Sequence, residues 1–124
     1  MKGAAKETRW GYPLQVWEAA RSQARAELLA RARSRETVAY SELCDAITAG
    51  RFRPYSWAFM ALVDDVCRDE DAAHGVILAS LVVRKDTRMP GEGYFAWAER
   101  SGLDVSDRGS CWQREAAKVW DAYA

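Results

Sequence analysis

The stretch ILASLVVRKDTRMPGEGYF, residues 77–95, decides the fold that we expect for this chain. It begins inside an apolar run, Val76–Val83, in which Ser80 is the only polar residue. A run of this length, rich in Val, Ile and Leu, is typical of a strand that is buried on both faces. The chain then becomes polar and basic at Arg84–Arg88. We therefore expect one buried strand that leads to a basic turn at the surface.

A glycine-rich corner follows the basic turn. The sequence Pro-Gly-Glu-Gly does not suit the interior of a helix or a regular strand. We interpret it as a tight corner that needs unusual backbone angles, or as a place where the backbone approaches a ligand. The pattern is too short for a phosphate-binding fingerprint, and no Lys-Ser or Lys-Thr pair follows it. The corner that we expect consists of Pro90, Gly91, Gly93, Tyr94 and Phe95.

Both flanks of this stretch carry helical patterns, with apolar residues at intervals of three and four. Thr37–Tyr40 is rich in β-formers and predicts a short strand. Serine residues before three of the helices are candidate N-caps, namely Ser41, Ser56 and Ser110. We expect residues 1–12 to be a flexible arm and residues 13–124 to be a single domain. The expected helices cover Leu14–Arg33, Glu42–Thr48, Trp57–Arg68, Tyr94–Arg100 and Cys111–Tyr123.

The net charge and the cysteine spacing exclude several classes of protein and site. The 124 residues carry 18 basic and 18 acidic side chains, so no global charge attracts nucleic acid or membranes. The three cysteines form no CxxC pair, which argues against a disulfide framework and a zinc site and favours free, mostly buried thiols. We expect no metal and no cofactor. The beginning of the sequence lacks an apolar signal segment, and no apolar run is long enough to span a bilayer, so we expect a cytoplasmic protein with no membrane contact. The heavy use of Ala and Arg with little Lys favours a bacterial origin. Most of the six Trp are expected to pack in the core.

The order of the elements predicts the fold class. Helix, short strand, helix, turn, helix, strand and turn is the order of a winged helix-turn-helix domain. We expect a mainly α protein with a small β-sheet, that is an α+β fold. It would be winged-helix-like, with an extra N-terminal helix and further C-terminal helices. The predicted helices 42–48 and 57–68 would form the helix-turn-helix, and Arg84–Gly93 would form the wing.

This arrangement places cations and aromatic side chains where such a domain contacts double-stranded DNA. Asp64 and Asp65 oppose that prediction, because they would lie near the phosphates. The first hypothesis is a non-catalytic module that binds DNA or is associated with a DNA-processing or defence system. The expected DNA contacts are Arg51, Arg53, Tyr55, Ser56, Trp57, Arg84, Lys85, Thr87 and Arg88.

Two alternatives stay open. The neutral charge, the acidic helix end and the spare aromatic residues also fit a regulatory adaptor that binds a protein partner or forms a homodimer. A further hypothesis is a small enzyme whose site is the Pro90–Phe95 corner together with Tyr40 and Glu115.

The segments TVAYSELCDAI, LASLVVRKDTRMPGEGYFAWA and CWQREAAKVWDAY resemble small bacterial winged-helix-like proteins and endonuclease-associated segments that have no settled activity. This resemblance covers residues 37–123 and is most specific at the Pro90–Phe95 corner. In layout the chain is also similar to the DNA-binding domain of alkylguanine-DNA alkyltransferase-like proteins. Their Pro-Cys-His-Arg-Val motif is replaced here by Leu78–Val83, which has no Cys or His, so the resemblance does not imply alkyl transfer.

Overall fold

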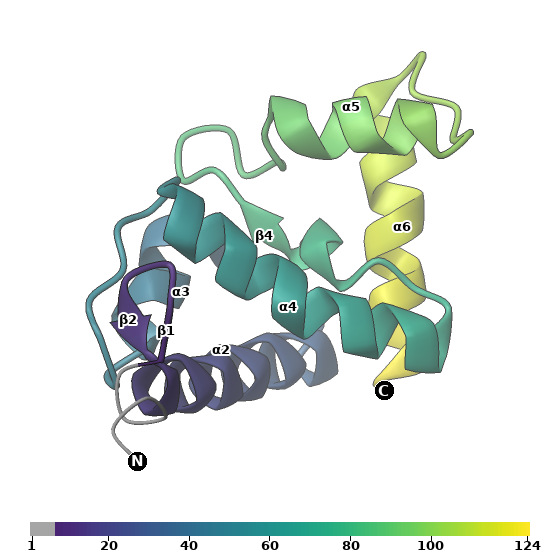
Figure 1. Ribbon diagram of the computed structural model, residues 1–124. Helices are drawn as coiled ribbons and strands as arrows, with labels where there is room; N and C mark the ends of the chain where they lie inside the picture. Colours follow the sequence, from purple (N-terminus) through teal and green to yellow (C-terminus); the bar gives the residue numbers. More distant parts are fainter. Residues whose placement is uncertain (1–6) are drawn as a thin grey trace.

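The fold of residues 7–124, described by a computed structural model, is mostly helical with very little sheet, which confirms a mainly α protein with a small β component (Figure 1). The helices are α2 (Leu14–Arg33), α3 (Tyr40–Ala46), α4 (Trp57–His74), α5 (Glu92–Arg100) and α6 (Arg108–Ala122), with a 3₁₀ turn η1 (Leu78–Leu81) between α4 and α5. The strands are β1 (Thr8–Arg9), β2 (Tyr12–Pro13), β3 (Val38–Ala39) and β4 (Val82–Val83). None of the helices in this range is long and apolar enough to cross a membrane.

The core lies between α2, α4, η1 and α6 (Figure 1). The buried residues of α2, α4 and α6 recur at intervals of three and four, so each of these helices presents an apolar stripe to the core. Trp17 on α2 and Phe59 on α4 are the largest side chains that are fully buried. The three cysteines are free and buried, as expected. The expectation that most tryptophans pack in the core is wrong: Trp17, Trp112 and Trp120 pack there, whereas Trp10, Trp57 and Trp97 are exposed at the surface.

Residues 1–6 of the expected flexible arm lie outside the described residues. From Thr8 to Pro13 the chain forms an antiparallel hairpin, β1 with β2. Tyr12 in this hairpin stacks on Phe52, with ring centroids 4.3 Å apart, and its hydroxyl donates to the carbonyl of Arg51. The hairpin therefore packs against the connection between α3 and α4.

The apolar run Val76–Val83 is buried, but the prediction of a strand over its whole length is wrong. Only Val82–Val83 forms a strand, and it pairs in parallel with Val38–Ala39. The preceding residues turn as η1 because their backbone groups find other partners: the Leu78 amide donates to Asp71 at 2.9 Å, and the Ser80 carbonyl accepts from Trp112 Nε1 at 2.7 Å. An apolar run shows burial, and it cannot distinguish a strand from a buried turn.

In the segment expected to form the wing, Arg84–Gly93, the structure has a turn followed by the start of α5. After β4 the chain closes a turn, with the Arg84 amide donating to Met89 and the Arg88 amide donating to Arg84. No return strand pairs with β4 within residues 7–124. The unusual backbone angle lies at Arg88, with φ 56°, and not at the two glycines of the corner. Gly91 is the N-cap of α5, with φ −81°, and Gly93 lies within the first turn of that helix.

One of the three expected serine caps is confirmed. Ser56 Oγ accepts from the Phe59 amide at 3.1 Å and begins α4. The prediction for Ser41 is wrong because Glu42 accepts from the Ala39 amide at 2.8 Å, which starts α3 at Tyr40. The prediction for Ser110 is wrong because Asp107 accepts from the Ser110 amide at 3.1 Å and begins α6 one turn earlier.

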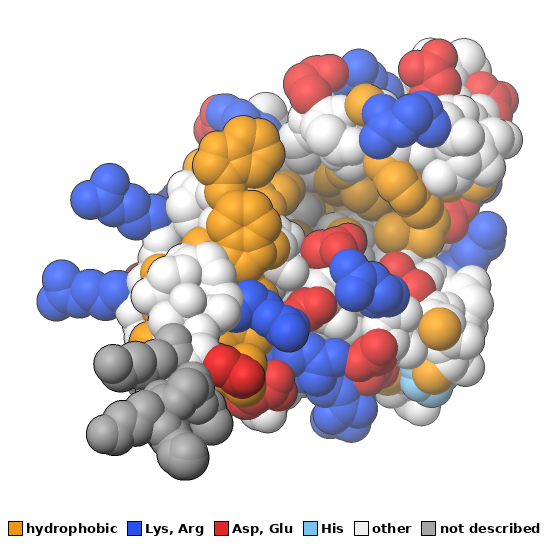
Figure 2. Space-filling view, viewed as in Figure 1, with side chains coloured by type: hydrophobic (Ala, Val, Ile, Leu, Met, Phe, Trp, Pro, Cys, Tyr) orange, Lys and Arg blue, Asp and Glu red, His pale blue; other side chains and the backbone are white. Residues whose placement is uncertain are grey.

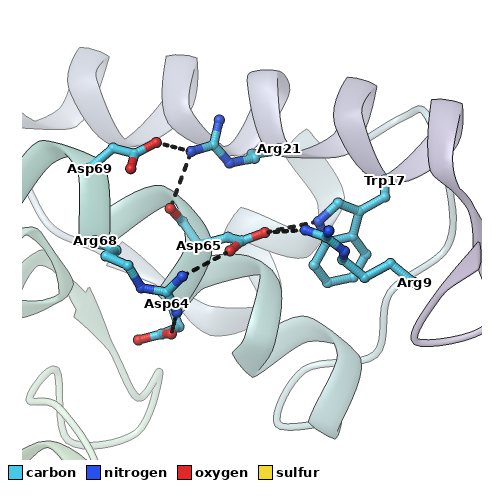
Figure 3. A network of polar contacts seen from close by, with 7 residues as sticks. All are labelled: Arg9, Trp17, Arg21, Asp64, Asp65, Arg68 and Asp69. Carbon is cyan, nitrogen blue, oxygen red and sulfur yellow. Dashed lines mark hydrogen bonds and ion pairs between the residues drawn. The ribbon is translucent and has the colours of Figure 1, made fainter.

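A polar network joins the middle of α4 to α2 and the hairpin (Figure 3). Asp65 accepts from Trp17 Nε1 at 3.0 Å and lies 3.4 Å from Arg9 and 3.6 Å from Arg68. Arg21 pairs with Asp69 and also donates to the carbonyl of Asp65. Asp65 and Asp69, on the acidic part of α4, are therefore linked to α2 through Trp17 and Arg21.

Candidate functional site

A groove with a volume of about 510 Å³ lies between α4 and α5, with η1 and β4 at its floor. A cavity of this size is within the range of small-molecule sites. The apolar part of its lining is formed by Met60, Val63, Cys67, Ile77, Ala79 and Val82. Figure 2 shows hydrophobic side chains gathered in the hollow between α4 and α5.

Four aromatic rings line the same groove, and they come from three different segments. Tyr40 begins α3, Tyr55 lies before α4, and Tyr94 and Trp97 lie on α5. Tyr40 and Tyr55 are in contact, with centroids 4.6 Å apart, and Tyr94 lies 6.4 Å from Trp97. The groove therefore has an aromatic pair at each side.

The two segments that were predicted to contact DNA meet at one side of this groove. The Arg84 guanidinium lies over the ring of Tyr55, with 5.9 Å between the guanidinium carbon and the ring centroid. Trp57 follows on the first turn of α4 and is 82% exposed. The structure thus brings Tyr55 and Arg84 together, although 28 residues separate them in the sequence.

The other predicted contacts lie around this pair. Ser56 is half-buried, because it caps α4. Thr87 Oγ1 donates to the Met89 carbonyl at 3.4 Å and is part of the turn. Arg88 donates to Thr37 Oγ1 at 3.1 Å, which directs it toward β3. The exposed members of the predicted set are Arg51, Arg53, Tyr55, Trp57, Arg84, Lys85, Thr87 and Arg88.

Most of the charged residues at the groove are neutralised within the protein. Arg84 pairs with Asp86 through two hydrogen bonds of 3.1 Å, which raise the pKa of Arg84 and lower that of Asp86. Asp64 accepts from Arg68 at 2.6 Å. Glu92 accepts from Arg108 at 2.6 and 2.9 Å, and this pair lowers the pKa of Glu92.

Asp71 differs from these groups. It lines the groove, and within residues 7–124 it forms no ion pair. Burial raises its pKa to about 6, the hydrogen bond from Leu78 opposes this rise, and the charges of Asp64 and Glu70 add to it. Asp71 is thus a carboxylate that the surrounding protein stabilises poorly in its charged form.

Tyr94, on α5, is held in place by a hydrogen bond to η1. Tyr94 shares a hydrogen bond of 2.7 Å with Ser80, whose side chain is fully buried. Burial raises the pKa of Tyr94 to about 12, so its hydroxyl stays protonated at neutral pH. The corner predicted from the sequence therefore serves to begin α5 and to set Tyr94 against η1.

Sequence reasoning missed Met60, Asp71 and Trp97 as members of this site. Asp71 had been grouped with the acidic end of the helix, and no local pattern separates it from Asp69 or Glu70. The alternative enzyme site is only partly assembled. Tyr40 lines the groove beside the corner, whereas Glu115 is buried on α6 with Lys118 as its partner at 3.1 Å and does not line the groove.

Within residues 7–124 no group of His, Cys, Asp and Glu is arranged to hold a metal ion. No protein-family model, curated protein or solved structure matches this chain significantly.

Proposed function

We propose that this protein is a winged-helix-like module that binds double-stranded DNA through the surface around Tyr55 and Arg84. In this arrangement α3 and α4 act as the helix-turn-helix, and the first turn of α4 enters the major groove. The turn after β4 takes the part of the wing. The observation that carries the proposal is the contact between Tyr55 and Arg84, because it joins the two predicted contact segments into one surface.

Charge supports this proposal. The DNA backbone is held mainly by Lys and Arg, and affinity grows with the number of phosphates that they neutralise. Exposed cations flank the Tyr55–Arg84 pair on both segments: Arg51 and Arg53 on one side, Lys85 and Arg88 on the other. Arg51 and Arg53 form no ion pair within the described residues.

The acidic residues of α4 are a weaker obstacle than the sequence suggested. Asp64 accepts from Arg68 at 2.6 Å, and the side chain of Asp65 is only 19% exposed and lies near Arg9 and Arg68 (Figure 3). The negative charge of both residues is therefore balanced by neighbouring arginines. The first turn of α4 carries no acidic residue.

Replacing Arg53 or Arg88 by alanine should weaken DNA binding about threefold to tenfold, because each change removes one candidate phosphate contact. The slope of log affinity against log salt should become shallower by about one for each lost contact. The measurement is fluorescence anisotropy with a labelled 20-base-pair duplex of mixed sequence, titrated at several salt concentrations.

Arg100→Ala is the matched control for this experiment, since Arg100 is an exposed arginine in the last turn of α5. It should leave the affinity and the salt slope unchanged. The proposal would be wrong if the native protein binds no duplex at low salt, or if all three variants bind as the native protein does.

A second candidate is a protein-binding or homodimeric adaptor, and one observation favours it. Met60 and Trp97 are large apolar side chains exposed in the lining of the groove, and Trp57 is exposed on the first turn of α4. Aromatic residues and Met are enriched at protein interfaces. Light scattering at about 100 µM should show a dimer if this face pairs with a second copy, and Trp57→Ala should shift it to a monomer. A native monomer would exclude the homodimer.

A further inference from the structure

The groove between α4 and α5 contains a charge for which the described chain supplies no counter-ion. Asp71 lies in its lining, and its carboxylate accepts one hydrogen bond, from the Leu78 amide. Every other charged residue of the lining has an ionic partner: Arg84 with Asp86, Asp64 with Arg68, and Glu92 with Arg108. A half-buried carboxylate without a cation is costly, and burial raises its pKa to about 6.

The rest of the lining suits an organic cation. The rings of Tyr40, Tyr55, Tyr94 and Trp97 surround the space, and the faces of aromatic rings attract ammonium groups. Arg84, which also lines the groove, already shows this interaction with Tyr55. The apolar wall of Met60, Ile77 and Val82 would cover the uncharged part of such a ligand.

Two residues of the lining, Gly91 and Gly93, contribute no side chain to the groove. Gly91 and Gly93 both line the groove, and neither has a positive φ. A Cβ atom built at either position meets no other atom within 4 Å. Side chains would fit there without a clash, and they would project from the start of α5, where the space is open.

We propose that this groove is a binding site for a small organic cation, with its ammonium group on Asp71 and a flat apolar body between the aromatic rings. The volume of about 510 Å³ accommodates a bicyclic aromatic amine. The site shares Tyr55 and Arg84 with the surface proposed to bind DNA, but its recognition of a cation depends on the charge of Asp71 and not on the exposed arginines. It stands whether or not the protein binds DNA.

Three probes of nearly the same shape test this inference: tryptamine as the cation, tryptophol as the neutral analogue, and indole-3-acetate as the anion. Binding is followed by chemical-shift changes in ¹H–¹⁵N spectra of the full chain, in particular at the amides of Gly91, Gly93 and Leu78. Tryptamine should bind at least about tenfold more tightly than tryptophol, because a charge-assisted hydrogen bond adds to the stacking. Indole-3-acetate should bind least.

Asp71→Asn is the decisive variant, since an amide oxygen can still accept from Leu78 while the charge is removed. It should abolish the preference for tryptamine over tryptophol and retain the spectrum of a folded protein. Trp97→Ala, a change at a partly exposed position, should weaken both probes about twofold to tenfold and keep their ratio.

The inference is overturned if none of the three probes binds at millimolar concentration, or if tryptamine and tryptophol bind equally to the native protein. It is also overturned if the preference for the cation persists in Asp71→Asn. Because these readouts do not involve DNA, their failure would leave the DNA proposal to its own test.

Discussion

Replacement of Trp17 by alanine is expected to lower the free energy of unfolding by about 3–5 kcal/mol, which is typical for removing a large aromatic side chain from a core. Trp17 is fully buried on α2. Its ring centroid lies 6.1 Å from that of Phe52, in an edge-to-face arrangement, and 6.4 Å from that of Tyr12. Trp17 therefore supports both the hairpin and the connection before α4. Domains of this size have a total stability of about 5–15 kcal/mol, so the melting temperature should fall by about 10–20 °C.

Two further variants separate packing from hydrogen bonding in this prediction. Trp17→Phe keeps most of the apolar contact but loses the bond to Asp65, so its cost should be clearly smaller than that of alanine. Trp57→Ala changes a side chain that is 82% exposed and should stay within about 0.5 kcal/mol of the native protein. Urea unfolding followed by circular dichroism gives all three values. Equal stabilities for the alanine variants at 17 and 57 would contradict the assignment of Trp17 to the core.

The sequence predicted α4 well at its start because the signals there are local. Ser56 precedes an apolar pattern, and its hydroxyl reaches the amide of Phe59 only three residues later. The end of α4 is marked by Gly75, with φ 66°, in a conformation that suits glycine. The same reasoning failed for Ser41 and Ser110, because nearby carboxylates of Glu42 and Asp107 act as the caps instead.

The segment after α4 could not be predicted from periodicity alone. Val76–Val83 is apolar because it is buried, and its conformation is decided by groups far along the chain. Trp112, 32 residues later, donates to the Ser80 carbonyl, and Tyr94 bonds to the Ser80 hydroxyl. The burial of Val76–Val83 can therefore be predicted from the sequence, whereas the choice between a strand and a 3₁₀ turn depends on tertiary contacts.

In the candidate site, too, single surface residues could be predicted from the sequence, whereas their arrangement depends on tertiary contacts. Tyr55 and Arg84 were each predicted as surface contacts, and the structure adds that they touch. The groove itself was not predicted, because it exists only where α5 lies beside α4 and η1. Asp71 has a role that differs from that of Asp69 for the same reason: one residue faces the groove, and the other pairs with Arg21 on α2.

Asp71→Asn is expected to make the protein more stable at neutral pH. The carboxyl has an ordinary pKa of 3.8 and a folded-state pKa of about 6, mainly through burial. The folded protein thus holds this proton more tightly than the unfolded chain does, so the native protein loses stability as the pH rises from about 4 to about 6. A tenfold change in proton affinity corresponds to about 1.4 kcal/mol. Because Asp71 is partly exposed, solvent reduces the effect, and we expect the free energy of unfolding of Asp71→Asn to exceed that of the native protein by about 1–2 kcal/mol at pH 7.5.

Urea unfolding of both proteins between pH 4 and pH 8 measures this effect. Near pH 4 the two curves should converge, because Asp71 is largely protonated in the folded state and close to half protonated in the unfolded one. Asp71→Ala is the control for the hydrogen bond: it leaves the Leu78 amide without its acceptor and should be less stable than Asp71→Asn by about 1 kcal/mol at every pH. Asp45→Asn, at an exposed position on α3, should change stability by less than about 0.5 kcal/mol.

A stability gain that appears only above about pH 5 would show that the charge of Asp71, and not its shape, works against folding. Charged groups that cost stability are characteristic of binding and catalytic sites, where their interaction with a ligand offsets the cost. If Asp71→Asn is instead less stable than the native protein at pH 7.5, then the carboxylate is favourably solvated or paired, and the groove has no unmet charge to offer a cation.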